Sequence, residues 1–197
     1  MKIRVTGIAG GLGSGKSMVS RILRLQGHDV YDCDHEARLL MEDAGHGVRA
    51  VLIERFGTDI FPGGGGLDRG RLAGLMFSDA EILAWVNATV HGAVREDVRA
   101  WIGDAASHGV KRVWIESAIL AGSGLTEVCD DVWLVTAPEE VRLDRAEGRG
   151  MSRTDAARRI ASQREETRLL MDAGLPVAEI ANGPDDTLLD RLAQLTR

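Results

Sequence analysis

The sequence predicts an α/β fold with a parallel sheet, and three observations indicate it. The chain has 197 residues, 44% of them hydrophobic, which suffices for one domain with its own core. Residues 3–9 (IRVTGIA) form a short β-branched run, and a glycine-rich loop separates it from residues 18–25, where apolar positions recur at helical spacing. Further short segments at 28–31, 113–116 and 131–135 read as additional strands.

Composition restricts the classes of function. The 24 basic and 30 acidic residues give a formal net charge of −6, which argues against a protein built to bind nucleic acid non-specifically. The two cysteines, Cys33 and Cys129, form no CxxC pair, so free thiols in a reducing compartment are expected. No signal segment and no apolar run of roughly 18–20 residues is present, which predicts a cytoplasmic protein without a membrane span. Nothing in the sequence indicates an oligomeric state.

The first loop carries the strongest motif, Gly10-x-x-x-x-Gly15-Lys16-Ser17, between a predicted strand and a predicted helix. This is the phosphate-loop (P-loop) pattern in its required context. Its backbone N–H groups would cradle phosphate oxygens, Lys16 would reach the β- and γ-phosphates, and the Ser17 hydroxyl would ligate Mg²⁺. The alternative is a glycine-rich turn that binds nothing. The predicted nucleotide contacts are Gly11, Gly13, Ser14, Gly15, Lys16, Ser17 and Met18.

Several P-loop classes are disfavoured. Guanine-nucleotide switches need an Asn-Lys-x-Asp and an Asp-x-x-Gly segment. Neither of the only asparagines, Asn87 and Asn182, precedes a lysine, and no Asp-x-x-Gly occurs, so the sequence disfavours this class. The run 113–116 ends in Glu116, but Ser117 follows it instead of the second carboxylate that motor ATPases use. A small-molecule kinase fits the length best, and it needs a base at the acceptor hydroxyl and a cationic lid.

Asp32 and Asp34 follow the second predicted strand, at the edge of the sheet where ligands of α/β proteins collect. They share one face only if the strand continues through them. Asp34 is a candidate general base, and it is equally a candidate cap for a helix predicted over 36–42. Spacing alone does not separate these two interpretations.

After Pro138 the chain reads as helical, with Arg142, Arg145 and Arg149 at spacings of three and four that place them on one face. Arginines that close over the transferred phosphoryl group would stabilise its charge, so this segment is predicted to be a lid. The alternative is a solvated face paired with Asp144, Glu147 and Asp155.

At this point the sequence resembles the dephospho-CoA kinase family, over nearly the whole chain. The P-loop is the first of six matching segments, and six matches in the same order along the chain are more specific than a P-loop alone. The other matches are Val30–Asp34 with Glu36–Arg38, Gly66–Ala73 with Phe77–Asp79, Asn87–His91, Arg145 and Arg149 with Arg159–Gln163, and Ile180–Gly183.

Four positions depart from the family pattern. Gly92 stands where the family usually has Pro, Met18 replaces the Thr after the P-loop Ser, and the loop between Arg149 and Ser152 is one residue short. Residues 118–122 (AILAG) replace a common Pro-Leu-Leu-Phe-Glu segment, which removes an aromatic and an acid near the expected acceptor.

The resemblance implies a P-loop kinase with a three-layer α/β/α core at 1–33, 110–138 and 169–197, a helical acceptor lobe at about 34–109 and a helical lid at about 139–168. It implies ATP and Mg²⁺ as cofactors and dephospho-CoA as the small-molecule substrate. It favours Asp34 as the base over the cap, with Lys16, Arg142, Arg145 and Arg149 assisting transfer. Arg69 and His91 become acceptor contacts, and Asn182, in a predicted turn, would lie near the adenine.

Alternatives remain for these last three residues and for the function. The simpler interpretations are that His91 is a buried structural histidine, that Arg69 pairs with Asp68 or Asp79, and that Asn182 only forms a turn. Another small-molecule or nucleoside kinase, or a nucleotide-binding regulator without activity, is the alternative function.

Overall fold

The computed structural model describes residues 2–43, 45 and 47–196, and it divides into two compact units. The sheet unit comprises Met1–Asp32 and Ile102–Arg197, and the helical unit comprises Cys33–Trp101. The strands are β1 (Arg4–Ala9), β2 (Val30–Asp32), β3 (Arg112–Glu116), β4 (Asp131–Thr136) and β5 (Val177–Ala181). The α-helices are α1 (Lys16–Leu25), α2 (Cys33–Glu42), α3 (Gly47–Phe56), α4 (Arg69–Ser78), α5 (Ala80–Ser107), α6 (Glu139–Glu147), α7 (Arg153–Ser162), α8 (Arg164–Asp172) and α9 (Leu188–Leu195).

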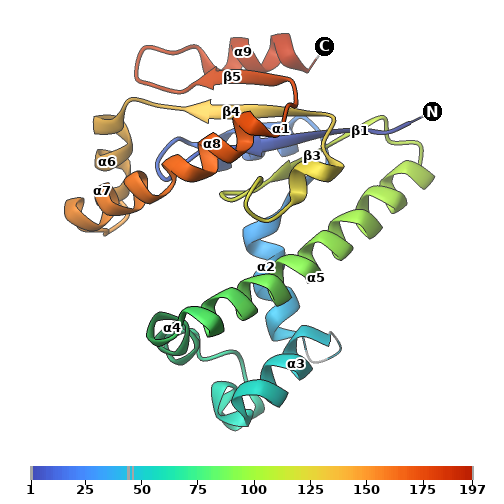
Figure 1. The fold of residues 1–197 in the computed structure, drawn as a ribbon. Coiled ribbons are helices and arrows are strands. Elements are labelled where there is room, and N and C mark those ends of the chain that lie inside the picture. The colour runs from blue at the N-terminus through green and yellow to red at the C-terminus, as the bar shows by residue number, and fades with distance from the viewer. Residues whose placement is uncertain (1, 44, 46, 197) are drawn as a thin grey trace. The chain divides into compact units, whose positions relative to one another are not determined.

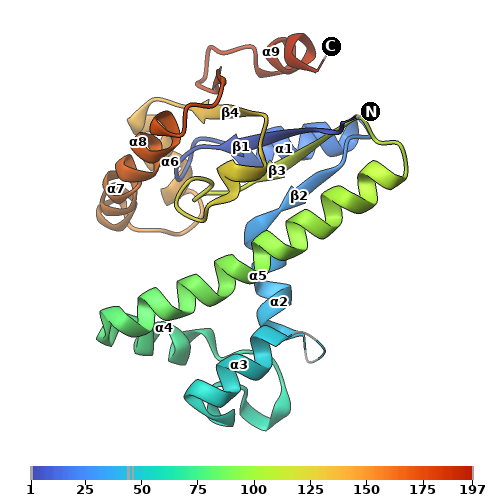
Figure 2. The same ribbon diagram turned by 45° about the vertical axis from the view of Figure 1, so that its right-hand side comes forward.

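The sheet is parallel throughout, in the order β2-β3-β1-β4-β5 (Figure 1, with β2 labelled in Figure 2). Figure 2 shows β1 and β3 running side by side, as their register of Ile8 opposite Glu116 requires. Parallel neighbours bring their carboxyl ends to one edge, so the P-loop after β1 and the acids Asp32 and Glu116 share that edge. The predicted α/β fold with a parallel sheet is confirmed.

The core lies on both faces of the sheet. On one face, α1 and α9 pack against the strands through a cluster of fully or almost fully buried side chains, Ile8, Val19, Leu23, Trp114, Trp133, Val135, Ile180 and Leu192. On the opposite face, Gly7 lies directly against Leu120 and Cys129. Strands buried on both faces explain why the predicted strands read as continuous apolar runs.

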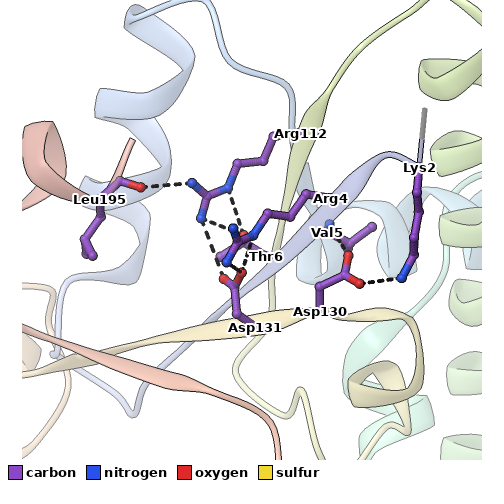
Figure 3. A network of polar contacts seen from close by, with 8 residues as sticks. All are labelled: Lys2, Arg4, Val5, Thr6, Arg112, Asp130, Asp131 and Leu195. Carbon is purple, nitrogen blue, oxygen red and sulfur yellow. Dashed lines mark hydrogen bonds and ion pairs between the residues drawn. The ribbon is translucent and has the colours of Figure 1, made fainter. Parts of the chain in front are cut away.

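A polar network joins the amino ends of the central strands (Figure 3). The Arg112 guanidinium donates to the Thr6 hydroxyl at 2.9 and 3.0 Å and to the Leu195 carbonyl of α9 at 2.9 Å. Its Nη2 lies 3.6 Å from the buried carboxylate of Asp131, which also accepts from Arg4 Nε at 2.6 Å. This network fixes α9 to the sheet at the edge opposite the P-loop.

The helical unit contains α2, α3, α4 and the larger part of α5, with short 3₁₀ turns at Thr58–Ile60 and Pro62–Gly64. Asp79 lies just before α5, and its carboxylate accepts the N–H groups of Glu81 and Ile82 at the start of that helix. The predicted boundaries of the lobe and lid stay predictions. The lobe boundary at residue 109 lies two residues beyond α5, and the lid boundary after residue 168 falls within α8.

Candidate nucleotide site

Positive φ angles shape the P-loop (residues 10–17). Gly13 has a φ of 76° and Gly15, which precedes the first residue of α1, has a φ of 98°. A Cβ on Gly13 would lie 2.5 Å from the Arg142 carbonyl oxygen, and one on Gly15 would overlap the Asn182 amide. Both the backbone angle and the close neighbours therefore require glycine at these two positions.

Three side chains from two distant segments bind the P-loop carbonyls. Arg142 Nε donates to the Leu12 oxygen at 2.8 Å, and Arg145 Nη1 donates to the oxygens of Gly13 and Ser14 at 3.0 and 3.3 Å. Asn182 Nδ2 also donates to the Ser14 oxygen, at 2.7 Å. We call Arg142, Arg145 and Asn182 the carbonyl clamp.

The carbonyl clamp sets the direction of the loop N–H groups. A trans peptide is planar, so each clamped C=O points opposite to the N–H of the next residue. The clamped carbonyls of Leu12 and Ser14 thus turn the N–H groups of Gly13 and Gly15 the other way. Among the described residues these two N–H groups have no hydrogen-bond partner. Outward-facing N–H groups of this kind form an anion-binding cradle.

The start of α1 adds positive charge to this cradle. Lys16 Nζ donates to the Gly10 carbonyl at 2.6 Å, which holds the ammonium beside the loop. Ser17 and Met18 are exposed in the first turn of α1, where the helix dipole favours anions. The loop, the lysine and the helix end therefore fit a chain of phosphates.

The predicted lid arginines do not form one helical face. Helix α6 ends at Glu147, so Arg149 lies outside it, and this part of the sequence analysis was wrong. Gly148 and Gly150, the latter with a φ of 85°, end the helix before Arg149. Arg149 is exposed, and its Nε donates to the Arg145 carbonyl at 3.0 Å.

Arg142 and Arg145 instead belong to the carbonyl clamp. Burial lowers the pKa of Arg142, against the opposing effect of Glu139. Arg145 Nη2 also donates to the Asn182 carbonyl at 2.8 Å, which ties the turn after β5 to the loop. Their action on a transferred phosphoryl group stays a prediction, and so does the expected position of Asn182 near an adenine.

Other arginines of this segment form the surface ion pairs that were the alternative interpretation. Arg153 pairs with Asp144 at 3.0 Å, with Glu147 at 2.6 Å and with Glu140. Arg158 pairs with Asp155 at 3.0 Å. The predicted acidic partners are therefore present, but they serve Arg153 and Arg158.

Glu116 is a candidate functional residue that the sequence analysis set aside. It ends β3 opposite Asp32 of β2 and Ile8 of β1, so it lies next to the start of the P-loop. Its Oε2 is buried without a hydrogen-bond partner among the described residues. Burial raises the pKa of Glu116 and the Asp32 charge acts in the same direction, whereas the neighbouring Ser20 hydroxyl and the Lys16 charge lower it. The sequence did contain a signal for this residue, because the predicted strand at 113–116 ends in an acid.

Asp34 lies in the first turn of α2, because β2 ends at Asp32 and α2 begins at Cys33. The strand does not continue, so Asp32 and Asp34 do not share a strand face. The capping alternative is also wrong, since Asp34 lies inside a helix that starts three residues earlier than predicted. Its side chain is exposed, and its role as a base stays a prediction.

Arg69 and His91 both lie in the helical unit. Arg69 pairs with Glu42 of α2 at 2.8 Å, so the alternative pairing with Asp68 or Asp79 is wrong. Burial lowers the pKa of His91, and the charge of Arg95 lowers it further, so the neutral imidazole is favoured. No observation tests the predicted acceptor contacts of either residue.

The divergent 118–122 segment has a partner of its own. The Ala121 and Gly122 N–H groups donate to the Glu166 carboxylate of α8, at 2.7 and 2.9 Å. A Cβ on Gly122 would lie 2.9 Å from Glu166 Oε2, so the glycine permits this approach. The backbone of this segment therefore binds a carboxylate that a distant helix supplies.

The residues present fit a nucleotide with Mg²⁺. Within the described part of the chain, no three His, Cys, Asp or Glu side chains gather as a metal cluster. Mg²⁺ beside phosphates needs only one or two protein ligands, because phosphate oxygens and waters supply the rest. The Ser17 hydroxyl and the unpartnered Glu116 oxygen are oxygen donors of the required type.

Sequence comparisons with known proteins identify one family. The dephospho-CoA kinase family model matches residues 4–178. A dephospho-CoA kinase of Porphyromonas gingivalis is 38% identical over 96% of this chain and 91% of its own length. The enzyme of the same name from Corynebacterium diphtheriae is 36% identical over 98% of this chain and 94% of its own.

Solved structures show the same fold. The crystal structure of TT1252 from Thermus thermophilus superposes with a TM-score of 0.79 at 29% identity, covering 100% of this chain and 97% of that one. A dephospho-CoA kinase from Campylobacter jejuni superposes with a TM-score of 0.70, covering 98% and 95%. At 15% identity the latter similarity concerns the fold alone.

Proposed function

This chain belongs to the dephospho-CoA kinase family, and we propose that it transfers the γ-phosphoryl group of ATP to the ribose 3′-hydroxyl of dephospho-CoA. The products are coenzyme A and ADP. The observation that supports this proposal best is the P-loop itself, whose clamped carbonyls leave the Gly13 and Gly15 N–H groups facing outward beside Lys16.

The P-loop would bind the phosphates of ATP. The N–H groups of Gly11, Gly13 and Gly15 would form the cradle with the start of α1, and Lys16 would neutralise charge on the β- and γ-phosphates. Lys16 must then exchange the Gly10 carbonyl for phosphate oxygens. Mg²⁺, held by Ser17 with Glu116 nearby, would neutralise phosphate charge when bound.

Asp34 would orient the ribose 3′-hydroxyl and accept its proton as that oxygen bonds to the γ-phosphorus. The bond from the γ-phosphorus to the bridging oxygen breaks, and its electron pair leaves with ADP.

Arginines of the 139–168 segment would complete the site. Arg149 is the candidate for direct contact with the phosphoryl group, because its guanidinium is exposed and only its Nε is bonded among the described residues. Arg142 and Arg145 would act by shaping the P-loop. Closure of this segment over the nucleotide would exclude water and so prevent hydrolysis of ATP.

Acceptor binding is proposed for Arg69 and His91, with Arg69 leaving Glu42 for an anionic group of the substrate. A cytoplasmic location is also proposed, since Cys33 and Cys129 are both free thiols, as in proteins of reducing compartments. None of the helices in the described part of the chain has the length and apolar character to cross a bilayer.

The test is release of ADP by the purified protein with Mg-ATP, with and without dephospho-CoA, followed by the mass of the product. We expect ADP only with the acceptor, and a product heavier by one phosphoryl group. Lys16→Ala is the matched inactive variant. Phosphorylation of a nucleoside in preference to dephospho-CoA, or nucleotide binding without any turnover, would contradict the proposal.

A further inference from the structure

Leu12, at the tip of the P-loop, is held through its side chain and both of its backbone polar groups. Its side chain packs against a small buried cluster of α6 and α7, formed by Leu143, Ala146, Ala156 and Ile160. Its carbonyl accepts from Arg142, and its N–H donates to Gln163 Oε1 at 2.6 Å. The 139–168 segment therefore contacts the loop through apolar packing and through two hydrogen bonds of opposite direction.

Gln163 is itself fixed between two helices. It lies between α7 and α8, where its N–H donates to the Arg159 carbonyl at 3.2 Å and its own carbonyl accepts from Thr167 at 3.3 Å. The side chain is half-buried and passes close to Gly11, where a Cβ would lie 2.9 Å from its Oε1. The oxygen that binds Leu12 is thus presented by a well-anchored backbone.

Gln163 governs the peptide group that precedes the cradle. Its oxygen fixes the plane of the Gly11–Leu12 peptide, and Arg142 fixes the Leu12–Gly13 peptide that carries the outward Gly13 N–H. Glycine on either side of Leu12 leaves both peptides free to rotate once these bonds are lost. ATP would then bind only the fraction of molecules whose loop faces outward, and its apparent Kd would rise by the inverse of that fraction.

We propose that Gln163 is a positioning residue for ATP, which holds the tip of the P-loop in its phosphate-binding form through the Leu12 N–H. The proposal rests on the proposed function only in taking ATP as the ligand. It assigns Gln163 no contact with the reacting atoms.

The test is the Kd for Mg-ATP of Gln163→Met, measured by calorimetry without acceptor. Methionine keeps the length of the side chain and removes the oxygen. We expect the Kd to rise about fivefold to tenfold, as loss of one hydrogen bond implies, with kcat at saturating ATP within about twofold. Gln194→Met, on the exposed face of α9, is the matched control and should bind like the wild type.

Other results would overturn the proposal. An unchanged Kd for ATP in folded Gln163→Met would leave Gln163 with a structural role only, even if the melting temperature falls. A fall in kcat without a change in Kd would also contradict it. If Gln163→Met does not fold, Gln163→Asn provides the same test, because its amide is one methylene too short to reach Leu12.

Coupling between sites is reciprocal, so ATP should also stabilise the segment that holds Leu12. We expect ATP to slow hydrogen exchange at the backbone amides of 163–167 in the wild type and to do so less in Gln163→Met. Equal slowing in both proteins would contradict the proposal. Because neither measurement needs an acceptor, absence of turnover with dephospho-CoA would refute the proposed function without affecting this test.

Discussion

Arg145→Met tests whether the carbonyl clamp shapes the P-loop or acts on the transferred phosphoryl group. Arg145 donates hydrogen bonds to the carbonyls of Gly13, Ser14 and Asn182. A hydrogen bond from a charged donor contributes about 1.5–3 kcal/mol. Ser14 keeps its bond to Asn182, and water replaces part of the loss because Arg145 is only half-buried. We therefore expect the free energy of unfolding to fall by about 2–4 kcal/mol.

ATP affinity should fall as well. With Gly13 and Ser14 less constrained, the outward N–H groups are ordered in a smaller fraction of molecules, and we expect the Kd for Mg-ATP to rise about tenfold. Arg145→Lys should not restore it, since an ammonium group cannot span three separated carbonyls as a guanidinium does. Arg149→Met, at an exposed position, should change the free energy of unfolding by less than about 0.5 kcal/mol.

Urea unfolding and calorimetric ATP titration measure the two effects separately. A purely catalytic arginine would give a different pattern, in which kcat falls at saturating ATP while the Kd and the free energy of unfolding stay near the wild-type values. That result would refute the inference that Arg145 acts by shaping the P-loop.

Three further perturbations address the acids. Asp34→Asn should lower turnover by about 10²–10⁴-fold without changing the urea midpoint, and near-normal rates in the folded variant would remove Asp34 from the role of base. Burial raises the pKa of Glu116, so the folded protein binds this proton more tightly than the unfolded chain does. The folded protein therefore loses stability as the pH rises from the ordinary carboxyl pKa to the raised value. Urea titrations across this window should show Glu116→Gln gaining stability relative to the wild type as the pH increases, and a difference independent of pH would contradict the raised pKa. Asp131→Asn leaves the partly buried Arg112 without its carboxylate and should lower the free energy of unfolding by about 2–4 kcal/mol, whereas a loss below about 1 kcal/mol in the same assay would show that Thr6 and the Leu195 carbonyl suffice for Arg112.

Local signals allowed the first half of the nucleotide site to be predicted. The strand, loop and helix around residues 10–17 are adjacent in sequence, and their glycines follow from the backbone angles that a phosphate cradle needs. The parallel sheet followed from short apolar runs, because strands buried on both faces lack alternation. By contrast, β5 was not predicted, since only Ile180 in it is fully buried.

The carbonyl clamp could not be predicted from the sequence. Arginine, asparagine and glutamine side chains that bind backbone oxygens and N–H groups leave no pattern, because every residue has the same backbone groups. The spacing of Arg142, Arg145 and Arg149 suggested a common helical face, but glycines after Glu147 end that helix first. Those glycines were the signal that could have corrected the prediction.

Gln163 and the carbonyl clamp both lie far from the P-loop along the chain, and this separation has a consequence for biosynthesis. Gln163 lies 151 positions after Leu12, and Asn182 lies 168 positions after Ser14. The ribosome therefore completes the whole Gly10–Ser17 motif long before the side chains that shape it are translated. A nascent chain stalled before residue 139 would display the motif but lack the ordered cradle, so nucleotide binding on stalled ribosomes would report completion of the carboxyl-terminal third of the protein.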